Sequence, residues 1–144
     1  MRDLGELAGF TGSTAVAINN SGQVVGQLFP AGFGVHGVLW TPHGVEDLGN
    51  FFAPRPVTIP LALNERGQIV GGSEISLSRI LHAFLWQHDV LQDLGALDLT
   101  PGHIFSQANA VNERGDVVGY GAGDPSPDTR HAVLWRRAPG GPHP

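Results

Sequence analysis

The chain repeats itself three times, and this repetition limits the folds open to its 144 residues more than any other feature. The tripeptide Asp-Leu-Gly begins at Asp3, Asp47 and Asp93, so its copies are 44 and then 46 residues apart. A later pentapeptide returns in the same order, at His36–Trp40, His82–Trp86 and His131–Trp135. Periods of about 20 to 50 residues are typical of solenoids, propellers and other arrays of one structural unit. We therefore expect three copies of one supersecondary unit.

Each copy has the pattern of four short strands. Its runs of β-branched and aromatic residues are bounded by turn residues, and no window has a helical period with caps. The first two runs are joined by a loop that opens on asparagine and closes on glycine: Asn19–Gly22, Asn64–Gly67 and Asn112–Gly115. An asparagine side chain bonds the backbone two residues on, and glycine accepts a positive φ. These asparagines are therefore predicted to form turns rather than to bind a ligand.

The predicted strands are apolar on both faces. In residues 82–86, Ala83 and Leu85 point one way, whereas Phe84 and Trp86 point the other. In a sheet with one solvent-exposed face, apolar and polar residues alternate along each strand. Both faces of these sheets are therefore expected to be covered. Four strands a unit and this period favour an all-β fold of three four-stranded antiparallel propeller blades in each chain. The alternative is a β-trefoil, which also has three repeats of four strands but closes as a monomer.

The repeated elements resemble a known family. Asp-Leu-Gly, then Ala-x-Asn followed by Gly-Gln-Val-Val-Gly, then His-Ala-Phe-Leu-Trp are similar to the HAF repeat, whose tripeptide stands here as His82-Ala83-Phe84. The resemblance covers residues 3–137, and the other two copies keep a small and then an apolar residue after histidine. It implies a β-propeller-like repeat protein and an extracellular location, and it implies no activity. Residues 1–5 have no signal-peptide pattern.

The repeat boundaries predict one domain over residues 1–137, with repeats at about 6–46, 47–92 and 93–137. No Asp-Leu-Gly follows Trp135, so we expect residues 1–5 to complete the last blade. The Pro- and Gly-rich segment 138–144 is predicted to be a flexible tail. Propellers have about 4–8 blades, and three are too few for a ring. We therefore expect a homodimer in which two chains close a six-bladed ring.

Composition excludes several functions. The net charge is −5 and no basic block occurs, which argues against nucleic acid as a partner. No apolar run approaches the roughly 20 residues of a membrane helix. The absence of cysteine excludes a disulfide framework, a thiolate metal site and a cysteine nucleophile. All eight basic residues are arginines, so the lysine of a phosphate-binding loop is missing as well.

The histidine that opens each pentapeptide is the repeated residue best suited to bind a metal ion or to transfer a proton. Three histidines related by pseudosymmetry can meet as metal ligands. A structural role is favoured, because a buried polar group needs a partner, and each blade offers an aspartate: Asp47, Asp93 and Asp3. The tryptophans of the pentapeptides are predicted to be core wedges between blades. No catalytic residue, metal site or cofactor is predicted.

A ligand is expected on the face with the long, unrepeated connections, since variable loops on a rigid scaffold are the usual place for binding. The aromatic and guanidinium groups predicted to bind there are Phe33, Phe52, Arg55, Arg79, Tyr120 and Arg130. The function predicted from the sequence is a non-catalytic binding or scaffolding module, with carbohydrate or protein as its ligand. The alternatives are a propeller-type hydrolase and a piece of a longer repeat protein without its own ligand.

Overall fold

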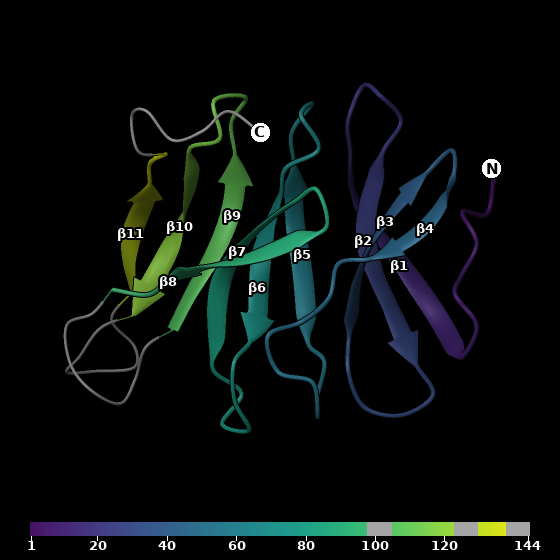
Figure 1. Cartoon of the computed structure of the whole chain (residues 1–144), viewed down its shortest axis with the longest axis horizontal. Helices are drawn as coiled ribbons and strands as arrows, with labels where there is room; N and C mark the ends of the chain where they lie inside the picture. The colour runs from purple at the N-terminus through teal and green to yellow at the C-terminus, as the bar shows by residue number, and fades with distance from the viewer. Residues whose placement is uncertain (98–104, 123–129, 138–144) are drawn as a thin grey trace.

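The computed structural model describes residues 1–97, 105–122 and 130–137, and the predicted tail 138–144 lies outside this part. The described residues form three antiparallel sheets and no helix, hence no helix able to cross a membrane (Figure 1). Sheet 1 contains β1 (Phe10–Ile18), β2 (Val24–Pro30), β3 (His36–Thr41) and β4 (Gly44–Asp47). Sheet 2 contains β5 (Thr58–Leu63), β6 (Ile69–Glu74), β7 (Leu81–Gln87) and β8 (Val90–Gly95). Sheet 3 contains β9 (Phe105–Val111), β10 (Val117–Ala122) and β11 (Arg130–Trp135).

The all-β prediction is confirmed, and each sheet is one sequence repeat. Strands follow one another in sheets 1 and 2 as an up-and-down series of four, and the described part of sheet 3 contains three. The sheets remain separate and none closes on itself, so the closed barrel of a β-trefoil is not formed. The turns after β1, β5 and β9 lie at one end of the molecule, and the connections after β2 and β6 lie at the opposite end (Figure 1).

The sheets pack face to face through two different faces of the same repeat. The face that carries tryptophan, here called the tryptophan face, consists in sheet 2 of Leu63, Ile69 and Trp86, which pack against sheet 1. The opposite or leucine face of sheet 1 supplies Ala17, Val25 and Leu39 to that contact, named interface 1. Interface 2, between sheets 2 and 3, repeats this arrangement with the equivalent residues: Ala62, Val70, Leu85, Val111, Val117 and Trp135.

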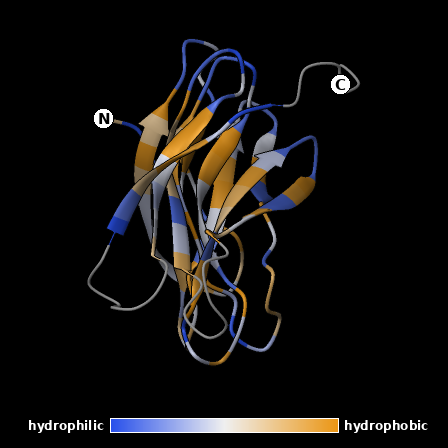
Figure 2. Ribbon diagram, turned by 90° about the vertical axis from the view of Figure 1, so that its left-hand side faces the viewer, coloured by the Kyte–Doolittle hydropathy of each residue, from blue (hydrophilic) through white to orange (hydrophobic). Residues whose placement is uncertain are grey.

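Two-sided burial explains why each second strand begins with two adjacent β-branched apolar residues. Val70 packs toward sheet 3, whereas its neighbour Ile69 packs toward sheet 1. Neither side chain of this pair is exposed to solvent. Much of the length of the strands is hydrophobic, as the hydropathy colouring shows (Figure 2). The prediction of sheets covered on both sides therefore holds for sheet 2.

Residues 1–5 lie elsewhere than expected for this chain. They form no strand, and the Gly5 carbonyl accepts a hydrogen bond from Trp40 Nε1 at 2.9 Å, which places this segment on the tryptophan face of sheet 1. Leu7 packs on the same face with Trp40 and Val24. Within the single chain, residues 1–5 therefore cover the apolar face of the first sheet instead of pairing with β11 of the last one.

Candidate functional site

A pocket recurs at each sheet interface, at the end of the molecule that carries the short turns. The pocket of interface 1 has a volume of about 300 Å³ and that of interface 2 about 370 Å³. Equivalent residues of the repeat line both pockets: a glutamine of the preceding sheet (Gln23 or Gln68), a turn glycine (Gly67 or Gly115) and a tryptophan (Trp86 or Trp135). The pockets are therefore a product of the repeat itself.

The turn asparagines stabilise the turns that border these pockets. Asn64 Oδ1 accepts the backbone N–H groups of Arg66 and Gln68, both at 3.0 Å, which confirms its predicted role as a turn former. Its Nδ2 also donates to the Asn112 carbonyl at 2.8 Å, and Asn19 Nδ2 donates to the Asn64 carbonyl at 3.1 Å. Asn19 and Asn64 thus each connect their own sheet to the next one, a role that turn chemistry alone did not predict.

The turn glycine is required by close packing as well as by conformation. Gly67 and Gly115 have φ values of 73° and 86°, a region that side chains rarely adopt. The Gln68 amide lies 3.2 Å from the position that a Cβ would take on Gly115. The glycine therefore lets the glutamine of the preceding sheet lie across the turn and form the pocket wall.

The two pockets differ in charge. At interface 1, the carboxyl groups of Glu46 and Asp89 lie together, beside Arg66. At interface 2, the position equivalent to Glu46 is Gln92, and Arg136 and Arg137 extend the rim. The hydrogen bond with Asp89, then burial, then repulsion by the Asp89 charge raise the pKa of Glu46 above its usual value of 4.5. Interface 1 is therefore the acidic pocket and interface 2 the basic one.

The Glu46–Asp89 pair predicts a pH-dependent stability. Because the folded state raises the pKa of Glu46, it binds the proton more tightly than the unfolded state, and its stabilisation is lost as pH rises through the raised pKa. Glu46→Gln should therefore raise the free energy of unfolding at pH 7 by up to about 0.5 kcal/mol, a small gain because water screens the pair. Urea unfolding of wild type and Glu46→Gln between pH 4 and pH 7 measures this. A matched change of the exposed Glu6 to Gln should leave that pH profile unchanged.

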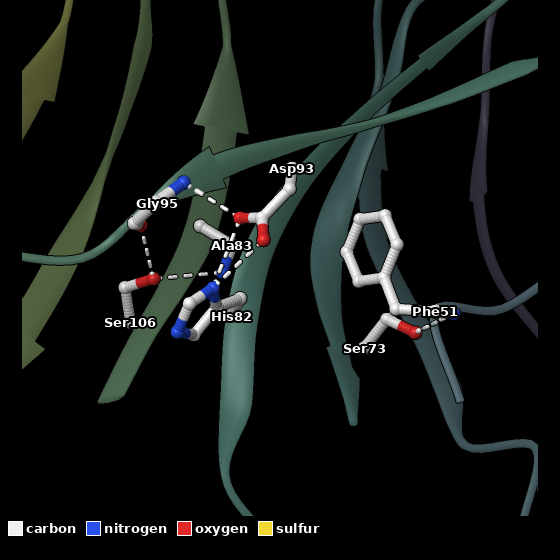
Figure 3. A network of polar contacts seen from close by, with 7 residues as sticks. All are labelled: Phe51, Ser73, His82, Ala83, Asp93, Gly95 and Ser106. Atoms are coloured by element: carbon white, nitrogen blue, oxygen red, sulfur yellow. Dashed lines mark hydrogen bonds and ion pairs between the residues drawn. The ribbon is translucent and has the colours of Figure 1, made fainter. Parts of the chain in front are cut away.

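The predicted histidine–aspartate pairs are present in the first two repeats. His36 Nδ1 lies 2.6 Å from Asp47 Oδ2, and His82 Nδ1 lies 2.9 Å from Asp93 Oδ2. Each pair joins the third and fourth strands of one sheet, and Figure 3 shows the pair of His82 and Asp93. In the part of the chain that the structure describes, no three histidine, aspartate or glutamate side chains gather closely enough to hold a metal ion.

The Asp-Leu-Gly motif forms a turn that connects one sheet to the next. Asp93 Oδ1 accepts the Gly95 N–H at 2.7 Å, and the Gly95 carbonyl accepts the Ser106 hydroxyl of sheet 3 at 2.6 Å (Figure 3). Ser106 Oγ also accepts the Ala83 N–H at 2.8 Å. Thr58 makes the equivalent bond to the Gly49 carbonyl at 2.7 Å. The buried Ser106 hydroxyl thus connects its own strand, β9, with β7 at Ala83 and with the end of β8 at Gly95.

Removal of this hydroxyl should be costly. Ser106→Ala leaves the buried Ala83 N–H and the Gly95 carbonyl without their partner, and each lost partner of a buried group costs about 1–3 kcal/mol. We expect the free energy of unfolding to fall by about 2 kcal/mol. Ser13, the equivalent residue of the first repeat, is exposed, so Ser13→Ala is the matched control and should change stability little. Equal losses in the two variants, measured by thermal unfolding, would contradict the assignment.

The six residues predicted to bind a ligand do not meet in one place. Phe33 is 86% exposed, and the Arg55 guanidinium lies 5.9 Å from its ring centroid. Phe52 is close to Arg55, whose N–H donates to the Phe52 carbonyl at 3.3 Å. Arg79 occupies a separate tight turn with φ of 59°.

Tyr120 and Arg130 form a second group on sheet 3. They belong to β10 and β11 rather than to the connection in which they were expected, because these strands extend further than predicted. The Arg130 guanidinium lies 4.8 Å from the Tyr120 ring centroid, and the Phe105 ring lies 5.6 Å from it. None of these six residues lines the pockets at the interfaces.

Sequence reasoning missed the interface pockets because it looked for variable residues. The pocket walls are residues of the repeat, such as Gln68 and Trp135, which recur for architectural reasons. A signal for these pockets was available in two positions that change between copies. Glu46 corresponds to Gln92, and His88 corresponds to Arg137. They stand at the same places in the repeat and differ in charge.

Comparison with known proteins gives no relative for this chain. No protein-family model, curated protein or solved structure matches it. The resemblance to the HAF repeat therefore stays a prediction from the motifs.

Proposed function

We propose that the chain is a non-catalytic binding module of the β-propeller type, and that its interface 2 pocket takes a carbohydrate. The pocket volume, about 370 Å³, lies in the range of about 300–1,000 Å³ typical of small-molecule sites. Trp135 offers an aromatic surface on which a sugar ring can stack. The side-chain amides of Gln87 and Gln92 and the guanidinium of Arg136 supply donors and acceptors for hydroxyl or carboxylate groups.

The lining of this pocket supports binding rather than turnover. Among the described residues that line it, none carries a carboxylate, an imidazole or a hydroxyl, and hydrolysis needs such groups as acid, base or nucleophile. The basic rim at Arg136 favours a ligand with negative charge. An acidic glycan is therefore the ligand class that the pocket fits best.

A glycan array followed by titration of the hits tests this function. Wild type should bind acidic glycans, and the double variant Gln92→Ala/Arg136→Ala should lose at least about tenfold in affinity, since two polar contacts of about 0.7 kcal/mol each are removed. The double variant Phe33→Ala/Arg55→Ala changes the long-connection face and should bind like wild type. Loss in the second variant alone would place the site at the long connections. Binding to no glycan, or cleavage of a bound one, would overturn the proposal.

We also propose that the three sheets are blades and that two chains form a six-bladed ring. The two outer faces of the chain are the two halves of the interface that it already forms twice. The leucine face of sheet 3 is open, with Val118 47% and Leu134 48% exposed, and Ile18 on the tryptophan face of sheet 1 is 69% exposed. Exposed apolar faces of this kind drive association, and a two-fold axis lets each chain cover both faces of its partner.

The hydrogen bonds that connect the turn asparagines of successive sheets also stop at the first and the last described sheet. Asn64 receives a bond from Asn19 and donates one to Asn112, whereas Asn112 Nδ2 bonds only Asp116 of its own turn among the described residues. A second copy would offer its Asn19 carbonyl as the next acceptor. Native mass spectrometry should give twice 15.2 kDa, about 30 kDa. Val118→Asp/Leu134→Asp should give a 15.2 kDa monomer, and Val90→Asp on the exposed β8 should not. A wild-type monomer would overturn the ring.

A further inference from the structure

We propose that residues 1–5 of one copy complete sheet 3 of the second copy, with Asp3 accepting a hydrogen bond from His131 across the two chains. This inference rests on the six-bladed pair proposed above and names the contact that closes it. The occupant of the β11 edge is a second copy of this chain.

The first observation is a repeated pair that is split at its last copy. His36 bonds Asp47 and His82 bonds Asp93, and in each case the aspartate follows the histidine by 11 residues. His131 is the equivalent histidine, and it has no hydrogen-bond partner among the described residues. Asp3 is the equivalent aspartate, and it accepts the Gly5 N–H but bonds no histidine among the described residues. The chain thus holds one donor and one acceptor of the same pair in separate places.

The second observation is that the Asp-Leu-Gly turn of residues 3–5 is already formed. Gly5 N–H donates to Asp3 Oδ1 at 2.9 Å, as Gly49 does to Asp47 at 2.8 Å. The φ values of Gly5 and Gly49 are 82° and 84°. Residues 3–5 thus already have the local conformation that the motif has at the end of a complete sheet. Little further conformational entropy is lost when they bind a partner strand.

The third observation is the place of this segment. In the complete repeats, the Asp-Leu-Gly turn lies between two sheets: its aspartate bonds the preceding sheet, and its glycine carbonyl accepts a bond from the following one. Residues 1–5 also lie on a following sheet, sheet 1. There the Gly5 carbonyl accepts the Trp40 indole N–H, whereas Gly49 and Gly95 accept hydroxyl groups of β5 and β9. Arg2 and Leu4 line a cavity of about 390 Å³ there together with Ile18 and Trp40. In the complete repeats, the aspartate of this motif bonds a histidine of the third strand of the preceding sheet, and in sheet 3 the third strand is β11, which carries His131.

The register of the complete repeats gives the expected pairing. Leu39 pairs with Glu46 and Leu85 with Gln92, both on the leucine face. The equivalent pair across the two copies is Leu134 with Arg2. Side chains directly opposite each other on antiparallel strands have Cβ atoms about 4.5–5.5 Å apart, close to the reach of a disulfide. Because the chain has no cysteine, two introduced thiols report on this contact without competition.

The test is oxidation of the double variant Arg2→Cys/Leu134→Cys, followed by non-reducing electrophoresis. We expect a covalent dimer of about 30 kDa as the main product. Arg2→Cys/Val90→Cys places the second thiol on an exposed residue away from β11 and should remain monomeric on the gel. An oxidised product that stays a 15.2 kDa monomer, whether with an internal bond or with none, overturns the exchange.

A second measurement separates failure of the exchange from failure of the ring. Asp3→Asn keeps the Asx turn but removes the charge that His131 would meet, so the dissociation constant of the dimer should rise about threefold to tenfold. Glu6→Gln removes one nearby exposed charge and should leave that constant unchanged. A wild-type dimer that forms no Arg2–Leu134 disulfide and is insensitive to Asp3→Asn leaves the ring standing and disproves the exchange. A wild-type monomer disproves both.

Discussion

Gly71→Ala is expected to lower the free energy of unfolding by about 3 kcal/mol or more, the upper range for overpacking of a well-packed interior. Gly71 pairs with Pro60 at a β-bulge, where one extra residue of β5 disturbs the register between Pro60 and Ala62. A Cβ on Gly71 would overlap the Ile59 carbonyl oxygen and would lie 2.9 Å from the Pro60 Cα. Backbone cannot move aside as a flexible side chain can, so the bulge or the pairing must give way.

Gly72→Ala is the matched control in the same strand. A Cβ at Gly72 would have its nearest neighbour, a Leu81 carbon, at 3.6 Å, which is an ordinary contact. This variant should be neutral or slightly stabilising, because alanine reduces the entropy of the unfolded chain. Urea unfolding of both variants measures the difference. A Gly71→Ala protein as stable as Gly72→Ala would show that the bulge does not constrain the strand.

The same clash recurs in the other two repeats, which explains why a glycine follows the apolar pair of each second strand: Val24-Val25, Ile69-Val70 and Val117-Val118. A Cβ on Gly26 would overlap the Thr14 carbonyl oxygen, and one on Gly119 would overlap that of Gln107. Register shifts occur opposite both, between Ala15 and Ala17 and next to Gly119. We therefore expect Gly26→Ala and Gly119→Ala to be destabilising as well.

Asn64→Ala should lower the free energy of unfolding by about 3 kcal/mol, because it removes several hydrogen bonds of a buried side chain at once. Asn64 is 3% exposed. Its Oδ1 accepts two backbone N–H groups of its own turn, and its Nδ2 bonds Gln68 Oε1 at 2.6 Å and the Asn112 carbonyl. The variant thus loses the turn and the connection between sheets 2 and 3.

Asn112→Ala separates the two effects. Asn112 makes the same bonds within its own turn, but it is exposed, and its Nδ2 reaches Asp116 rather than another sheet. Its loss should cost about 1 kcal/mol, the usual value for a turn or cap residue. Chemical unfolding of both variants gives the difference, which measures the bond between sheets. Equal losses would mean that the asparagine acts in its turn alone.

Recurrence in the sequence was a good guide to local structure. Three copies of Asn-x-x-Gly predicted the hairpins, and the structure forms each one with the glycine N–H bonded to the asparagine carbonyl at 3.0–3.2 Å. The pairs of His36 with Asp47 and of His82 with Asp93 were predicted because a recurring polar pair in an apolar strand needs an internal partner. These features depend on residues close together in one repeat.

The interface pockets were not predicted from the sequence. Phe33 and Arg55 were chosen as variable residues on long connections. They contact each other and Phe52, and they do not line the interface pockets. The interface 2 pocket lies between Gln68 of one sheet and Trp135 of the next, residues 67 positions apart that no local pattern connects. Its walls follow from how far the sheets are offset when they stack, which depends on packing rather than on spacing along the chain.

The sequence by itself determined the number of repeats, most of the strands, their turns and the burial of both faces of sheet 2, because hydrophobic period and turn chemistry act over a few residues. Only the tertiary structure decided that the tryptophan face of one sheet covers the leucine face of the sheet before it. It also decided that Asn64 ties two sheets together and that residues 1–5 lie on sheet 1. These contacts join residues far apart in the chain, and their free energy arises only when whole sheets meet.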